Sequence, residues 1–166
     1  VNDVLELSRI ESGNMSFRCE DCSAHHFAET VYQTHQVIIL PPVEFIKEFP
    51  DEDVTIHIDR MRLTQVITNF LGNAKKFTSQ GHIKLGYFCD KEKKEIHFFV
   101  EDTGAGIPKE ELQMIFERFY KRNEFVQGVG LGLAISKVIV EKMNGHIDVQ
   151  SEVNKGSRFT AVLPYL

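Results

Sequence analysis

The chain has 166 residues, of which 42% are apolar and 26% charged, as is ordinary for a globular protein with one sizeable core. Its net charge of −5 argues against a nucleic-acid partner or an anionic membrane surface, since both favour a basic face. No apolar run approaches the ~20 residues of a membrane span, and no charged-then-apolar leader marks a signal peptide. We therefore expect a cytoplasmic domain that makes no direct membrane contact and binds no nucleic acid.

The first segment, residues 1–13, has the spacing of a helix. Apolar side chains recur three residues apart from Val1 to Ile10, and Gly13 follows as a helix-ending residue. Because this pattern is already under way at Val1, we expect a piece of a longer protein. A narrow apolar stripe favours a partner helix, although packing on its own domain explains the spacing equally well.

Three cysteines, an odd number, fit a reducing compartment and form no disulfide framework. Cys19 and Cys22, followed by His25 and His26, imitate half of a zinc site, but no second pair has matching spacing. We expect these thiols to carry no metal.

The next segments predict a strand, a helix and two further strands. Residues 15–19 form the short strand, and Ser23 is the expected N-cap of a helix over 24–39 whose buried side includes residues 37–40. Pro41 and Pro42 end that helix. Residues 43–49 and 54–58 alternate as strands joined by a turn.

Residues 59–78 predict the principal helix of the chain. At about 100° per residue, one stripe of it is apolar: Leu63, Val66, Ile67, Phe70, Leu71, Ala74 and Phe77. Asn69, Asn73 and Lys76 gather beside that stripe. Two amide oxygens and a cation suit a hydrated Mg²⁺ ion and the phosphates it bridges, while an ordinary amphipathic helix with a polar border is the alternative.

A hairpin over 82–89 and 95–101 delivers Asp102 to the end of its second strand. Gly104 and Gly106 follow, and a loop with two glycines in three residues lets backbone approach a ligand closely.

The last third contains a second glycine run. Residues 109–120 predict a short helix, and residues 128–132 then lead into an apolar helix over 131–143. Glycines at a helix start expose amide N–H groups to an anion, although tight packing explains them equally well. Residues 146–151 and 157–163 form a closing hairpin.

These elements predict an α+β fold: a two-layer sandwich with a mixed, mostly antiparallel sheet covered on one face by three helices. The chain lacks the GxxxxGK[ST] sequence of P-loop proteins and the strand-GxGxxG-helix arrangement of dinucleotide-binding proteins.

Four segments, NFLGNAKKFT, DTGAGIP, FERFY and GVGLGLAI, resemble in order and spacing the catalytic ATP-binding domain of sensor histidine kinases, which has the Bergerat-type fold. The resemblance covers the whole chain. It implies that residues 1–14 end a dimerisation and phosphoacceptor helix and that residues 15–166 form the catalytic domain. The segment FERFYKRNEFVQGVGLGL is similar to hybrid two-component sensors of Bacteroides-type bacteria.

The resemblance also implies roles for single residues. Asn73 resembles the Mg²⁺ ligand, Asn69 its partner one turn earlier and Lys76 the phosphate-contacting lysine, and these three are the implied catalytic residues. Asp102 resembles the residue that accepts a hydrogen bond from the adenine amine, with Gly104, Gly106 and Ile107 beside the base.

A nucleotide lid is implied between the two glycine-rich stretches. Phe116 and Phe119 resemble its anchors, and Tyr120, Lys121 and Arg122 could reach the γ-phosphate. Its hinge and phosphate cradle are Gly128, Gly130, Leu131 and Gly132. The lid is shorter than in many relatives.

Gyrase and heat-shock chaperone ATPases resemble this family but carry a glutamate where this chain has Asn69. An amide is a poor general base, so the site should hold ATP without readily hydrolysing it. None of the seven histidines lies in a phosphoacceptor context. The implied function is therefore transfer of the ATP γ-phosphate to a histidine of a separate dimerisation domain.

The implied partners are that upstream domain, within a homodimer, and a response-regulator receiver domain whose aspartate takes the phosphoryl group. The implied location is the cytoplasm, as a free protein or as the cytoplasmic part of a membrane-bound sensor. A non-catalytic nucleotide-sensing scaffold and a hydrolysing ATPase are the alternatives.

Overall fold

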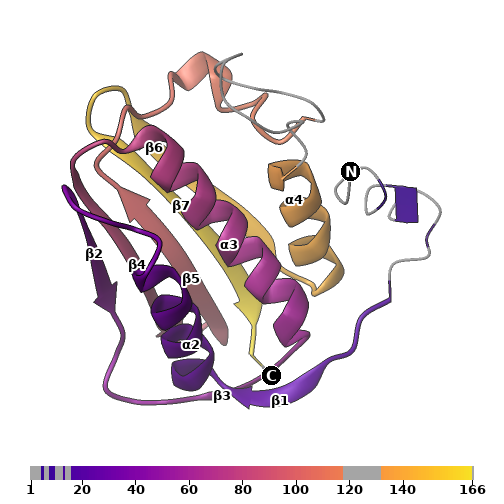
Figure 1. Cartoon of the computed structure of the whole chain (residues 1–166). Helices are drawn as coiled ribbons and strands as arrows, with labels where there is room; N and C mark the ends of the chain where they lie inside the picture. The colour runs from indigo at the N-terminus through magenta and orange to yellow at the C-terminus, as the bar shows by residue number, and fades with distance from the viewer. Residues whose placement is uncertain (1–4, 6–7, 10–12, 14–15, 118–131, 166) are drawn as a thin grey trace.

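The computed structural model of the chain describes residues 5, 8–9, 13, 16–117 and 132–165. A five-stranded sheet in the order β2-β4-β5-β7-β6 forms one layer. Its strands are β2 (Val43–Glu48), β4 (Gly81–Asp90), β5 (Glu95–Asp102), β6 (His146–Glu152) and β7 (Gly156–Pro164). The helices α2 (Ala24–Gln36), α3 (Arg60–Phe77) and α4 (Gly132–Lys142) cover one face of it (Figure 1). The predicted two-layer α+β sandwich is confirmed.

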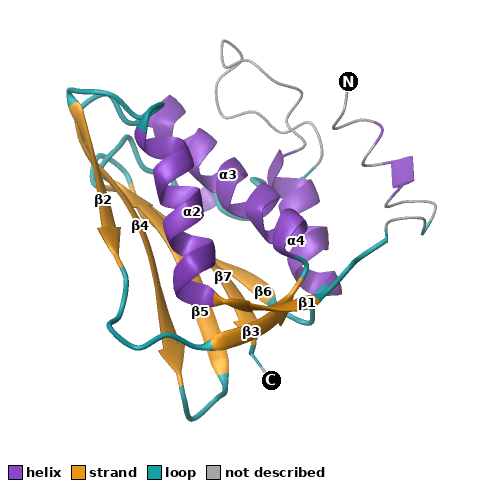
Figure 2. Ribbon diagram, turned by 60° about the horizontal axis from the view of Figure 1, so that its bottom comes forward, coloured by secondary structure: helices purple, strands orange, loops and turns teal. Residues whose placement is uncertain are grey.

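The second view shows the three helices on the same side of the large sheet, with none of the described helices on the other side (Figure 2). The strand β2 runs parallel to β4, and the remaining neighbours in this sheet are antiparallel. A second, two-stranded sheet pairs β1 (Glu20–Ser23) with β3 (Thr55–Ile58). The large sheet therefore has a helix-covered face and an open face.

Helix α3 is the centre of the core. Six apolar side chains of its predicted stripe are buried, whereas Phe77 at its end is partly exposed. Asp59 caps the helix by accepting a hydrogen bond from the Arg62 N–H at 3.1 Å, and it also accepts one from the Arg18 N–H at 2.8 Å. One carboxylate thus fixes both the start of α3 and the chain that precedes β1.

The prediction for the first strand was wrong, because β1 lies at Glu20–Ser23 rather than at 15–19. The two strands predicted over 43–49 and 54–58 are confirmed as β2 and β3. They do not pair with each other, because β2 joins the large sheet and β3 the small one. Alternation of apolar and polar residues indicates a strand but does not say which strand is its partner.

Helix α2 is shorter than predicted. Ser23 caps it as expected, accepting from the His26 N–H at 3.0 Å, but the helix ends at Gln36. The chain then turns, so Val37 and Leu40 are 75% and 62% exposed and only Ile39 of that run is buried. A run of four apolar residues therefore marks a turn and not a helix face.

Both predicted hairpins are confirmed. The strands β4 and β5 pair with Asp90 opposite Glu95, and β6 and β7 pair with Glu152 opposite Gly156. The helix predicted over 109–120 is, in its described part, a three-residue 3₁₀ turn at Lys109–Glu111. Pro108 before it offers no side-chain cap.

Helix α4 begins at Gly132 and ends at Lys142, close to the prediction. Asn144 ends it with a positive φ of 65°. The helix predicted over 1–13 lies, apart from residues 5, 8–9 and 13, outside the described residues.

Candidate functional site

Helix α3 borders both groups of predicted site residues: Asn69 and Asn73 lie on the helix itself, and Asp102 lies near its C-terminal end. The side-chain amide of Asn69 donates to the Gly132 carbonyl at 3.1 Å and to the Ser136 hydroxyl at 2.9 Å. Ser136 is fully buried. These two bonds hold the first turn of α4 against the middle of α3, with Asn73 one turn further along.

Asp102 lies at the carboxyl end of β5 and is only 8% exposed. Its carboxylate accepts a hydrogen bond from the Gly104 N–H at 2.9 Å. Burial raises the pKa of this carboxyl above its ordinary value, and the backbone N–H groups of Gly104 and Ser157 partly offset the rise. The site therefore holds a carboxylate whose charge is only partly compensated.

Thr78 follows α3 directly and is buried beside Asp102. Its hydroxyl faces the carboxylate and contributes to lowering the Asp102 pKa, yet it makes no hydrogen bond of good geometry within the part of the chain that the structure describes. A buried hydroxyl without a partner costs about 1–3 kcal/mol. A ligand that presents both an N–H donor and an acceptor would complete this pair.

The glycine loop after β5 packs tightly on its surroundings. A Cβ at Gly104 would lie 2.3 Å from the Phe77 carbonyl oxygen, and one at Gly106 would lie 2.1 Å from that of Glu152. The Ala105 N–H donates to Phe77 at 3.2 Å. Both glycines thus have a packing reason in the structure, and their place beside a bound base stays a prediction.

Two further hydrogen bonds tie this loop to the hairpin of β6 and β7. The Ile107 N–H donates to the Ser151 hydroxyl at 2.7 Å, and the Asn154 N–H donates to the Ala105 carbonyl at 2.8 Å. The loop is therefore fixed at both ends, next to Asp102 and Thr78. A ligand would meet a preformed surface here.

Some of the remaining predicted site residues lie within the described part of the chain, and others lie outside it. Asn73 is half-buried and Lys76 is exposed, and at Gly132 an added Cβ would contact Asn69 at an ordinary 3.6 Å. Phe116 is partly buried against the core. The predicted lid residues Phe119, Tyr120, Lys121, Arg122, Gly128, Gly130 and Leu131 lie outside the described residues.

Thr78 and Ser136 belong to the site although no role was predicted for them. Thr78 is the last residue of the segment NFLGNAKKFT, so its place within that motif was the available signal. Ser136 lies inside an apolar helix, where the facing Asn69 gives its buried hydroxyl a hydrogen-bond partner.

A cavity of about 710 Å³ lies elsewhere, between α2 and the first half of α3. Phe27, Thr34 and Met61 are among the residues that line it, together with Asp59, and none of the predicted site residues does. It is therefore separate from the site around Asp102.

Residues 58–166 match the family described as "Histidine kinase-, DNA gyrase B-, and HSP90-like ATPase". The chain is 35% identical over 170 residues to the sensor histidine kinase WalK of Bacillus subtilis, covering 99% of this chain and 28% of that protein. It is 36% identical over 170 residues to the sensor histidine kinase RcsC of Salmonella typhimurium, covering 99% and 18%. The chain thus spans less than a third of the length of these relatives.

Solved structures agree with these matches. Full-length ShkA in complex with AMPPNP superposes with a TM-score of 0.90 at 28% identity, covering 99% of this chain and 35% of that one. The catalytic domain of the histidine kinase ThkA superposes with a TM-score of 0.78 at 27% identity, covering 90% and 97%. None of the helices in the described part of the chain is long and apolar enough to cross a lipid bilayer.

Proposed function

Because the chain belongs to the family of histidine kinase-, DNA gyrase B- and HSP90-like ATPases, we propose that it is the ATP-binding catalytic part of a sensor histidine kinase. In this proposal residues 15–166 bind ATP and residues 1–14 end the dimerisation and phosphoacceptor helix. The γ-phosphate passes to a histidine of that separate domain and then to an aspartate of a response regulator. The names of WalK and RcsC as sensor histidine kinases support this choice within the family.

The observation that carries the proposal is the pair formed by Asp102 and Thr78. A buried carboxylate accepts N–H donors, and the neighbouring Thr78 hydroxyl makes no hydrogen bond of good geometry within the described residues, so it can still accept one from a ligand. The amino edge of adenine supplies such donors. The AMPPNP bound to ShkA is an adenine nucleotide, which supports this assignment.

The role of Asn69 separates phosphoryl transfer from hydrolysis. Its amide nitrogen is engaged by Gly132 and Ser136, and its oxygen has no useful proton affinity with which to activate water. Phosphoryl transfer depends mostly on positioning and charge neutralisation. The bound γ-phosphate therefore awaits a nucleophile from another domain.

The half-buried amide of Asn73 fits an oxygen-preferring Mg²⁺ ion, with Asn69 one turn earlier and Lys76 as a phosphate contact. When bound, Mg²⁺ neutralises the charge on the phosphates. The chain's own contribution is to hold these three side chains on one rigid helix beside the start of α4. The N–H groups at that start are suited to phosphate oxygens.

Several histidines of the described residues lie beside carboxylates on the surface. His57 contacts Asp21 at 2.9 Å, and His146 contacts Asp148 at 3.5 Å. Because none of the seven histidines lies in a phosphoacceptor sequence context, we assign the phosphoacceptor to a separate domain.

The test is transfer of label from γ-labelled ATP. With Mg²⁺, the chain alone should bind ATP and stay unlabelled, whereas an added dimerisation domain carrying its histidine should become labelled. Asn73→Ala should abolish this labelling, and His146→Ala should serve as the control that leaves it unchanged. Stable labelling of the chain itself, or release of phosphate without an acceptor at the rate of transfer, would overturn the proposal.

A further inference from the structure

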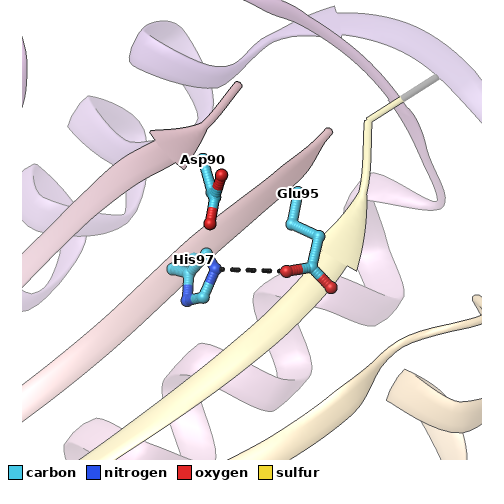
Figure 3. A group of neighbouring side chains, drawn as sticks. All are labelled: Asp90, Glu95 and His97. Carbon is cyan, nitrogen blue, oxygen red and sulfur yellow. Dashed lines mark ion pairs between the residues drawn. The ribbon is translucent and has the colours of Figure 1, made fainter. Parts of the chain in front are cut away.

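A second group of polar side chains lies at the other end of β5, on the open face of the sheet. Cys89, Ile96 and Phe98 pack against the core on the helix-covered face. Because side chains alternate along a strand, Asp90 and the residues Glu95 and His97 of β5 point to the opposite face. Figure 3 shows these three side chains facing one another there.

The three side chains are placed as ligands of one ion would be. One ligand atom of each lies within 4.8 Å of the others, and all three residues are half-buried. His97 Nε2 and Glu95 Oε1 are 3.7 Å apart, too far for a hydrogen bond. Ligands at about 2.0–2.2 Å from a tetrahedral metal lie about 3.4 Å from each other. Because the separations among the three ligand atoms extend up to 4.8 Å, the Asp90 and Glu95 side chains would rotate inward to hold an ion.

His97 presents an unsatisfied nitrogen to this group. Its Nε2 atom is buried and has no hydrogen-bond partner within the described residues. The ring is held by stacking on Phe88, with centroids 4.5 Å apart and an interplanar angle of 19°. The orientation of the ring is thus fixed before any ligand arrives, as in sites that bind with little reorganisation.

Two carboxylates face each other in this group. Asp90 and Glu95 are directly opposite in the antiparallel register, and like charges in such positions destabilise a sheet. One oxygen of Asp90 accepts from the Glu92 and Lys93 N–H groups, both at 3.1 Å, which leaves the other oxygen available. The neighbouring cation Lys91 is paired with Glu52 at 3.0 Å. A cation between the two carboxylates would remove the repulsion.

From this geometry we propose that Asp90, Glu95 and His97 form a binding site for a divalent transition metal ion such as Zn²⁺. An imidazole with two carboxylates suits such an ion better than Mg²⁺ or Ca²⁺, which prefer oxygen ligands alone. Water would fill the remaining positions. The ion would clamp the end of the hairpin of β4 and β5 by joining both strands.

This site is separate from the one around Asp102. Seven residue steps along β5 at about 3.3 Å each place the two ends roughly 23 Å apart. Alternation along the strand also puts Asp102 on the helix-covered face and Glu95 on the open one. Zinc binding here therefore needs no nucleotide, and its test is independent of the proposed kinase activity.

The first test is a Zn²⁺ titration of the nucleotide-free chain against a chromophoric competing chelator. We expect one site in the wild type that His97→Phe, Asp90→Asn and Glu95→Gln each weaken by at least about tenfold. The phenylalanine keeps the stack on Phe88, and the two amides are close in shape to the carboxylates. All three variants should therefore fold, and a thermal melt without metal checks this.

Two controls exclude other zinc ligands. His146→Phe removes a histidine that lies beside a carboxylate on β6, which β7 separates from β5, and a double Cys19→Ser, Cys22→Ser variant removes the only Cys-x-x-Cys pair in the sequence. Both should bind Zn²⁺ as the wild type does. Unchanged binding in the His97, Asp90 and Glu95 variants, or loss of binding in either control, would overturn the proposal.

A second readout is thermal stability. A metal that binds the folded chain and not the unfolded chain raises the melting temperature as its concentration rises. We expect Zn²⁺ to raise it in the wild type and in both controls, and not in His97→Phe. An equal rise in His97→Phe would show that the metal acts elsewhere on the chain and would contradict the proposed clamp.

Discussion

The two ends of β5 present carboxylates in opposite surroundings. Asp102 is buried on the helix-covered face, accepts from backbone N–H groups and lies beside the Thr78 hydroxyl, which has no hydrogen-bond partner of good geometry among the described residues. Glu95 is half-buried on the open face, opposite a second carboxylate and beside a histidine. The first arrangement suits a neutral donor such as an adenine amine, whereas the second suits a cation. The surroundings, and not the carboxyl group, determine what each end can bind.

Substitution of Gly106, in the loop after β5, should change the free energy of unfolding more than any other proposed variant. Its φ of 73° and the 2.1 Å approach of a Cβ to the Glu152 carbonyl oxygen predict that Gly106→Ala destabilises the chain by about 2–4 kcal/mol. Gly72→Ala in α3, where an added Cβ meets nothing within 4 Å, should instead stabilise by about 0.5–1 kcal/mol. Urea unfolding measures both, and equal effects would contradict the packing of the loop.

The contact between α3 and α4 should give the next largest effect. Asn69→Ala removes two hydrogen bonds, one of them to a fully buried hydroxyl, and should cost about 1–2 kcal/mol. In a double-mutant cycle with Ser136→Ala, the two changes should couple by about 1 kcal/mol. Strict additivity in urea unfolding would show that the bond between them contributes nothing.

Asp102→Asn should stabilise the ligand-free chain at neutral pH. Burial raises the folded-state pKa of Asp102 above its unfolded value of about 3.9. Protonation of Asp102 stabilises the folded chain relative to the form with an ionised carboxylate. This stabilisation is complete below the unfolded-state pKa and is lost as the pH rises through the higher folded-state pKa. Above that point the ionised carboxylate opposes folding, and the amide removes this opposition.

The gain should therefore shrink as the pH falls toward about 4, where the wild-type carboxyl also becomes neutral. Chemical unfolding at several pH values tests this. Asp148→Asn, at an exposed position of β6, should change the stability by less than about 0.5 kcal/mol. A gain for Asp102→Asn that does not depend on pH would contradict the role of burial.

The smallest effect is expected at the other end of the strand. Glu95→Gln removes the repulsion between directly opposite carboxylates and should stabilise the metal-free chain by about 0.2–1 kcal/mol. Because the repulsion is electrostatic and partly exposed, the gain should fall at high salt. A loss of stability in metal-free buffer would show that the pair with His97 outweighs the repulsion.

The parts of the fold that local sequence determines could be predicted. The hairpin of β4 and β5 follows from alternation on both sides of a charged turn, and the stripe of α3 follows from its period. The partners of β2 and β3 could not be predicted, because alternation does not identify the strand that lies alongside. The helix was predicted to extend too far for a related reason: the hydrophobicity of Val37 and Leu40 suggested burial, whereas the chain turns there and both side chains are exposed.

The sites show the same division. Asn69, Asn73 and Asp102 could be named from their motifs, but the hydrogen bonds of Asn69 to α4 depend on how the two helices pack. No role was predicted for Thr78, because a threonine directly after a helix is explained by the end of the helix alone. The group of Asp90, Glu95 and His97 arises from the register across the hairpin turn, so only the paired strands bring it together.

Adenine recognition at Asp102 is the central claim about the nucleotide site. Isothermal titration of Mg²⁺-AMPPNP and of the matching guanosine analogue tests it directly in the wild type and in Asp102→Asn. We predict that the wild type prefers the adenosine analogue and that the variant loses about 1–3 kcal/mol of that preference, roughly a 5- to 150-fold change in relative affinity. A wild type that binds both analogues equally, or a variant with an unchanged preference, would contradict the account.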